Sequence, residues 1–162
     1  MNRRIRSKRA QAMVEFALLV PAFFMLLLGV LDLGRAGFYF VSASGLARQG
    51  ARYASSFDNG FGWGSAGTFN FISIQSQAQT IPLSQPVGCD TTVPAVGSLT
   101  ACQTPGVGNG YLFIHDVPAA GGAPHYVQVS VVYAFRPTTP MISALTGTIY
   151  IVGTSSMDTE YP

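Results

Sequence analysis

The sequence contains few charged residues. Asp, Glu, Lys and Arg make up 10% of its 162 residues, well below the roughly 25% that is usual in soluble domains. The charges are also unevenly placed, because Arg136 is the only Lys or Arg after residue 57, where five carboxylates occur. A protein that binds nucleic acid through a folded domain needs a basic face on that domain. The composition therefore excludes nucleic-acid binding as the function.

Motifs for catalysis and metal binding are lacking too. The histidines, His115 and His125, and the two cysteines have neither Cys-x-x-Cys nor His-x-x-x-His spacing, which a metal site would favour. There is no Gly-x-Ser-x-Gly elbow, phosphate-binding loop or His-Glu-x-x-His motif, the usual signatures of several enzyme classes. We therefore expect no metal, no cofactor, no small-molecule substrate and no enzymatic activity.

Charge is absent altogether from residues 16–31, and five basic residues precede this run: Arg3, Arg4, Arg6, Lys8 and Arg9. About 20 apolar residues cross a bilayer, and Lys and Arg stay on its cytoplasmic side. We expect one membrane helix spanning about residues 16–34, with the N-terminus in the cytoplasm. A cleaved secretory signal would have a shorter run. A lipoprotein signal would need a cysteine at the end of the run, whereas the first cysteine is Cys89.

Acidic residues stand at both ends of the run. A charge in the bilayer core costs roughly 2.5–3.5 kcal/mol on insertion scales, so Glu15 is expensive in a segment that serves only as an anchor. Either Glu15 pairs with a cation of a neighbouring subunit, or it lies at the level of the lipid headgroups. Asp32 and Arg35 are three residues apart on one helix face and are expected to pair, within the chain or between subunits.

Residues 9–16, Arg-Ala-Gln-Ala-Met-Val-Glu-Phe, resemble the processing site of type IV-like prepilins. Three further blocks extend this resemblance: Leu-Asp-Leu-Gly-Arg at 31–35, Ala-Arg-Gln-Gly-Ala-Arg-Tyr at 47–53, and residues 129–147. Taken together, they resemble the TadE-like family, the minor pseudopilins of the tight-adherence (Tad/Flp) pilus apparatus.

The resemblance implies a mechanism of assembly. A prepilin peptidase would cut between Ala10, where Gly is more usual, and Gln11. Glu15 would then neutralise the new amino terminus of a neighbouring subunit inside a low-dielectric helix bundle. The implied partners are the prepilin peptidase, other pseudopilins, the major Flp-type pilin, the inner-membrane assembly platform and membrane lipid. The alternative is an unprocessed single-pass inner-membrane anchor whose periplasmic domain binds another molecule.

The predicted fold class is α+β, with a mainly antiparallel β-sheet packed on the extension of the membrane helix. We predict a basic cytoplasmic leader at residues 1–10, a long helix at 11–57 and a periplasmic head at 58–162. Beyond the membrane, Phe38, Val41 and Leu46 form a thin apolar stripe. Arg48 and Arg52 share a helix face and are predicted to contact the acidic head, or else to be solvated.

Within the head, residues 58–67 contain four glycines and predict a loop that carries Phe61 and Trp63. Residues 69–80 fit either a strand or a short amphipathic helix, and we favour a helix at about 72–80. Cys89 and Cys102 would lie on the oxidising side of the inner membrane, where a single pair of cysteines is expected to form a disulfide.

The C-terminal part of the head predicts β-structure. The period of two from residue 127 to residue 135 is typical of a strand: it puts Gln128 and Ser130 on one face, and on the other Val127, Val129, Val131, Tyr133 and Phe135. We predict strands at 111–117, 126–136 and 148–158, with a turn at 118–124 and a helical turn at 140–145. The last two strands should pair antiparallel.

Overall fold

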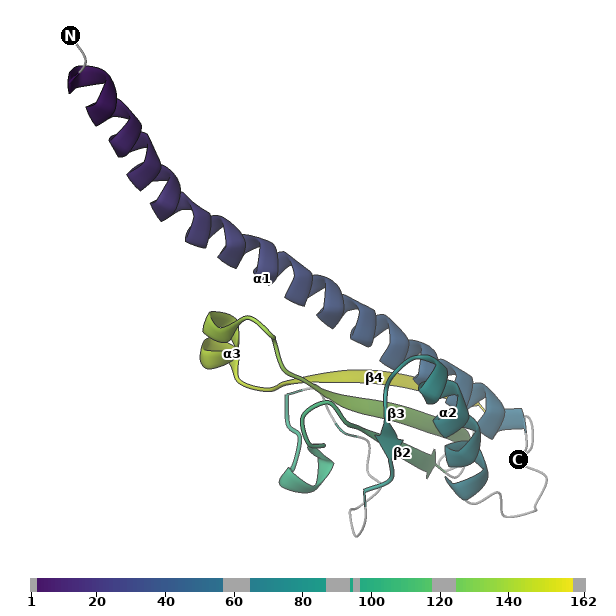
Figure 1. The fold of residues 1–162 in the computed structure, drawn as a ribbon. Helices are drawn as coiled ribbons and strands as arrows, with labels where there is room; N and C mark the ends of the chain where they lie inside the picture. The colour runs from purple at the N-terminus through teal and green to yellow at the C-terminus, as the bar shows by residue number, and fades with distance from the viewer. Residues whose placement is uncertain (1–2, 57–64, 87–93, 95–96, 118–124, 159–162) are drawn as a thin grey trace.

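The computed structural model describes residues 3–56, 65–86, 94, 97–117 and 125–158, with the side chains of 3–9 and 65–67 left aside (Figure 1). The predicted Phe61–Trp63 loop, the 118–124 turn and Cys89 lie outside the described residues. The described elements occur in this order: α1 (Arg3–Ser56), α2 (Ser65–Ala78), β1 (Leu83–Ser84), the 3-10 turn η1 (Ala101–Gln103), β2 (Gly110–Val117), β3 (Tyr126–Phe135), α3 (Pro140–Thr146) and β4 (Ile149–Asp158).

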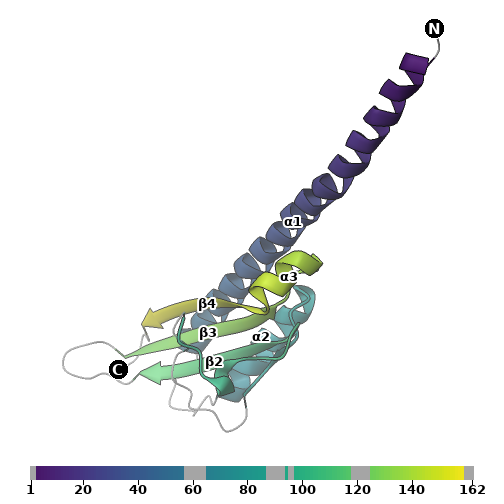
Figure 2. The same ribbon diagram turned by 90° about the vertical axis from the view of Figure 1, so that its left-hand side faces the viewer.

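The long helix α1 dominates the molecule. It begins at Arg3, within the predicted leader, and runs through Pro21 to Ser56 without interruption. Figures 1 and 2 show its N-terminal half standing free, while its C-terminal half lies along the sheet. The predicted long helix and the α+β fold are both confirmed.

The head is a four-stranded sheet in the order β1-β2-β3-β4. β2, β3 and β4 pair antiparallel, and the two-residue β1 adds to β2 in parallel. The predicted pairing of the last two strands is confirmed over its full length, from Tyr126 opposite Asp158 to Phe135 opposite Ile149. The sequence predictions omitted β1 because a two-residue strand has no periodicity to recognise.

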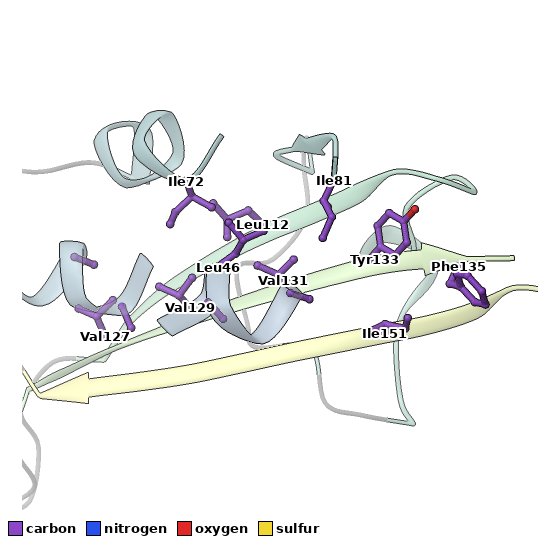
Figure 3. Close-up of a cluster of buried hydrophobic side chains, with 14 residues drawn as sticks. Leu46, Ile72, Ile81, Leu112, Val127, Val129, Val131, Tyr133, Phe135 and Ile151 are labelled. Carbon is purple, nitrogen blue, oxygen red and sulfur yellow. The ribbon is translucent and has the colours of Figure 1, made fainter. Parts of the chain in front are cut away.

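One face of the sheet packs against α1 and α2 and forms the core (Figure 3). Alternation along β3 turns five side chains into this core, as predicted: Val127, Val129, Val131, Tyr133 and Phe135. Ile72 of α2 is fully buried in the same cluster. The short helix expected at 72–80 corresponds to α2, which begins earlier, at Ser65, and ends at Ala78.

The face of α1 that meets the sheet is built from small residues around a single large one. Ala43, Ala47, Ala51 and Ala54 are fully buried beside Leu46. The predicted stripe was therefore wrong in part, because Phe38 and Val41 point outward and are 56% and 69% exposed. The small side chains let the helix backbone approach the sheet closely, and larger residues on this face would hold it away.

The predicted contact of Arg48 and Arg52 with the acidic head stays a prediction, because Asp58, Asp90 and Glu160 lie outside the described residues. Both side chains are exposed, and neither forms an ion pair with any residue that the structure describes. At this level of the helix, the described contact with the sheet is made by apolar side chains such as Ala47, Ala51 and Ala54.

The other face of the sheet is covered by the segment around η1. Val132 and Ala134 are fully buried there and Phe113 is 2% exposed. Gln103 of η1 and Pro105 are buried with them. The head therefore has three layers: helices, sheet and an irregular covering segment.

Candidate assembly site on the long helix

The N-terminal half of α1 exposes almost all of its apolar side chains. From Ala10 to Leu31, only Val20 and Gly29 are even partly buried. Within Ala10–Ser56, the most apolar stretch has a mean hydropathy of 2.4 and none of it is buried. This is the one helix among the described residues that is long and apolar enough to cross a membrane. Such a surface needs lipid or neighbouring helices to cover it.

Glu15 lies near the beginning of this surface. Its Oε1 accepts a hydrogen bond from Gln11 Nε2 at 3.2 Å, one helical turn earlier. Both side chains are exposed. The carboxylate therefore has a neutral partner within its own helix and keeps its negative charge available for a cation outside the chain. The helix is continuous through the Ala10–Gln11 bond, and the basic side chains Arg3, Arg4, Arg6, Lys8 and Arg9 precede it.

Asp32 anchors the head to the end of the apolar run. Its side chain is 6% exposed, and its two oxygens accept hydrogen bonds from the backbone N–H groups of Thr138 and Thr139, at 3.0 and 2.8 Å. Thr139 is the N-cap of α3. One carboxylate thus fixes the turn that joins β3 to α3 against the long helix.

Arg35 completes this junction. Its guanidinium lies 3.5 Å from Asp32 Oδ1 and also donates a hydrogen bond to Thr138 Oγ1. The predicted Asp32–Arg35 pair is confirmed as a contact within the chain. The two backbone hydrogen bonds were not predicted, because their donors are more than 100 residues away along the chain and no local pattern marks them.

Aromatic packing continues the junction towards the head. Tyr39 of α1 stacks on Tyr133 with ring centroids 4.5 Å apart, and it lies 5.8 Å from Phe135. Burial and a hydrogen bond with Tyr39 raise the pKa of Tyr133 to about 12, so this tyrosine is neutral at physiological pH. Residues 32–39 of α1 are therefore held to the head by a carboxylate, an arginine and an aromatic stack.

Among the described residues, the remaining polar candidates that contact each other are His125 and Asp116. His125 Nε2 lies 2.5 Å from Asp116 Oδ1. His115 is the residue before Asp116 on β2, so the two side chains point to opposite faces of the strand. The Asp116 carboxylate is 57% exposed. The described residues contain no group of three or more His, Cys, Asp or Glu side chains that could hold a metal ion. Cys102 belongs to η1, but its expected partner Cys89 lies outside the described residues, so the disulfide stays a prediction.

These features define a class of protein: a single long helix with an exposed apolar N-terminal half, carrying an α+β head on its C-terminal half. The family model described as TadE-like protein matches residues 10–52, so this segment of the chain is similar to the TadE-like family. The match lies within α1 and does not reach the predicted C-terminal block at 129–147. No curated protein and no solved structure matches the chain.

Proposed function

We propose that the protein is a pseudopilin of a Tad/Flp-type pilus apparatus. It is held by α1 in the bacterial inner membrane, with its N-terminus in the cytoplasm and its head in the periplasm, and it contributes to pilus assembly, initiation or adhesion. Its role is structural and not enzymatic. The family of residues 10–52 supports the pilus system.

The single observation that carries the proposal is the placement of Glu15. A carboxylate in an exposed apolar helix surface is costly in lipid, and here its described partner is only the neutral Gln11 amide. Cleavage after Ala10 would put a new α-amino group on Gln11. Glu15 of one subunit would then pair with that amino group on another, which sets the register between adjacent helices.

The partners follow from this role. A prepilin peptidase would act at Ala10–Gln11, and related pseudopilins, the major Flp-type pilin and the inner-membrane platform would contact α1 and the head. The exposed apolar half of α1 would remain in lipid until it joins a helix bundle, where helices pack through small residues and close contacts.

A second candidate is an unprocessed single-pass anchor whose periplasmic head binds another molecule. Two observations favour it: α1 is continuous through the Ala10–Gln11 bond, and Glu15 has a hydrogen-bond partner within its own chain. Under this candidate, Glu15 would have no role beyond the helix.

The first test is the N-terminus of the mature protein. We expect intact-mass analysis of the membrane fraction to give a chain that starts at Gln11 in the host, and a chain that keeps its leader in a strain without the prepilin peptidase. A leader retained in both strains would contradict processing and favour the unprocessed anchor.

The second test addresses Glu15 itself. Glu15→Gln removes the charge and keeps the shape, so we expect it to insert in the membrane normally but to abolish pilus assembly. Met13→Gln is the matched control, because it adds the same amide at an exposed position of the same segment and leaves Glu15 in place. Piliation measured by electron microscopy should survive in the control. Normal piliation in Glu15→Gln would refute the pairing mechanism.

A further inference from the structure

The short helix α3 and the residues after it form an apolar end of the head. From residue 137 to residue 157 the chain contains no Asp, Glu, Lys, Arg or His. α3 buries none of its own residues, and its Leu145 and Met141 are 85% and 55% exposed. Ile149 and Tyr150 follow it and are each 38% exposed. We call these four residues the α3 patch.

The structure places this patch beside the apolar run of α1. Ile142 turns inward from α3, and a Cβ atom built on Gly29 would lie 3.4 Å from its Cδ1. Gly29 belongs to the uncharged run that ends at Leu31. The hydrogen bonds from Thr138 and Thr139 to Asp32 hold α3 at this level. In both ribbon views α3 lies at the end of the head nearest the N-terminal half of α1 (Figures 1 and 2).

The level of the bilayer surface follows from the same helix. About 20 residues cross the hydrocarbon core, and the span predicted at about residues 16–34 ends roughly 8 Å beyond Gly29 at 1.5 Å per residue. A head element that touches Gly29 therefore reaches the acyl–headgroup boundary of the leaflet from which the head projects. Exposed apolar side chains are covered by lipid at that depth, whereas they would be unfavourable in water.

The residues around the patch suit this environment as well. Tyrosine is enriched at membrane interfaces because its ring is apolar and its hydroxyl is polar, and Tyr150 follows directly after Ile149. Arg136 precedes the charge-free stretch and is exposed, so its guanidinium can reach lipid phosphates. Ile149 also lines a hollow with Gly29 of α1, and Tyr150 lines one with Leu99. Leu145 and Met141 are therefore the most exposed members of the patch.

We propose that the α3 patch is a second membrane contact, through which the head rests on the lipid surface. It would fix the head against the bilayer and restrict its tilt relative to α1. This contact depends on α1 spanning the membrane and does not depend on a role in a pilus.

Depth-dependent fluorescence quenching in the full-length protein tests the proposal. The one tryptophan, Trp63, is replaced by Phe, and a reporter is introduced as Leu145→Trp. The protein is reconstituted alone in phosphatidylcholine vesicles, with and without bromine atoms on the acyl chains near the headgroup. We expect brominated lipid to remove most of the Leu145→Trp emission, and the emission maximum in ordinary lipid to be shifted to the blue.

Two further tryptophan variants serve as a positive and a negative control for quenching. Leu26→Trp replaces an exposed side chain of the apolar run and should be quenched. Ile74→Trp replaces a side chain of α2 that is 67% exposed. α2 packs near Gly50 of α1, roughly 28 Å beyond Leu31 at 1.5 Å per residue, so Ile74→Trp should keep its emission. If Leu145→Trp perturbs folding, Met141→Trp gives the same measurement from the preceding turn of α3.

The outcomes separate this proposal from membrane anchoring and from self-association. Unquenched Leu26→Trp would mean that α1 does not insert, which would overturn anchoring and the α3 contact together. Quenched Leu26→Trp with unquenched Leu145→Trp and Met141→Trp would overturn the α3 contact alone. A blue shift that grows with protein density, without quenching by brominated lipid, would assign the patch to a second copy of the chain and would also overturn the proposal.

Discussion

Gly153 is the position where the head is most sensitive to added volume. It lies opposite Val131 on the core side of β4, where α1 crosses the sheet. A Cβ atom on Gly153 would lie 2.6 Å from both Ala43 C and Ser44 N, and 2.8 Å from Ala43 O. Non-bonded carbon atoms prefer about 3.5–4.0 Å. The Gly153→Ala variant therefore has to push the helix backbone and the strand apart by about 1 Å.

Two opposing effects set the magnitude. Overpacking a core costs typically about 1–3 kcal/mol, and a contact between two backbones belongs at the upper end of this range because neither can change rotamer. Replacing Gly by Ala also restricts the unfolded chain, which returns about 0.4–1 kcal/mol. We expect Gly153→Ala to lower the free energy of unfolding by about 2 kcal/mol, or to lower Tm by about 8 °C, at about 4 °C per kcal/mol for a domain of 100–150 residues.

The assay is thermal unfolding of the full-length protein in detergent micelles, followed by near-ultraviolet circular dichroism, which reports the packing of tyrosines such as Tyr39 and Tyr133. Gly45→Ala is the matched control, because Gly45 lies in α1 with nothing within 4 Å of an added Cβ. This control should gain up to about 1 kcal/mol from helix propensity.

The contact at Gly153 involves the backbone of Ala43, which no side-chain change removes. Ala43→Gly should therefore fail to restore the stability of Gly153→Ala. A Tm for Gly153→Ala equal to or above that of the unchanged protein would refute the close approach of α1 and β4.

Two further predictions concern the junction and the covering segment. Asp32→Ala removes two charge-assisted hydrogen bonds to Thr138 and Thr139, each worth about 1.5–3 kcal/mol, and should destabilise the head by about 3 kcal/mol or more in the same unfolding assay. Asp32→Asn should cost less because its amide keeps one acceptor, and equal Tm values for all three proteins would contradict the anchoring role. A disulfide between Cys89 and Cys102 should appear as a crosslinked peptide pair in mass spectrometry of the non-reduced protein. Its reduction should lower the free energy of unfolding by about 3 kcal/mol. Two alkylated thiols in the protein taken from the envelope would rule the disulfide out.

Sequence alone determined the features that depend on neighbours along the chain. The long uncharged run with its basic leader predicted α1, and the blocks around Glu15, Asp32 and Arg52 predicted the family later matched at residues 10–52. The alternation from Val127 to Phe135 predicted which side chains of β3 share a face, because side chains of a strand alternate with a period of two. It did not predict that the other face, with Val132 and Ala134, is buried as well. The ion pair of Asp32 with Arg35 was also predictable from local spacing, because residues three apart share one helix face.

Only the tertiary structure decided which side of α1 receives the head. Phe38 and Val41 looked like the contact face by size, but the sheet approaches through alanines because a close crossing at Gly153 leaves no room for large side chains. The partners of Asp32 and the position of α3 beside Gly29 also depend on bringing together residues more than 100 positions apart. Local sequence patterns do not predict such contacts, because they form only when two distant segments pack together and their buried backbone N–H groups require hydrogen-bond acceptors.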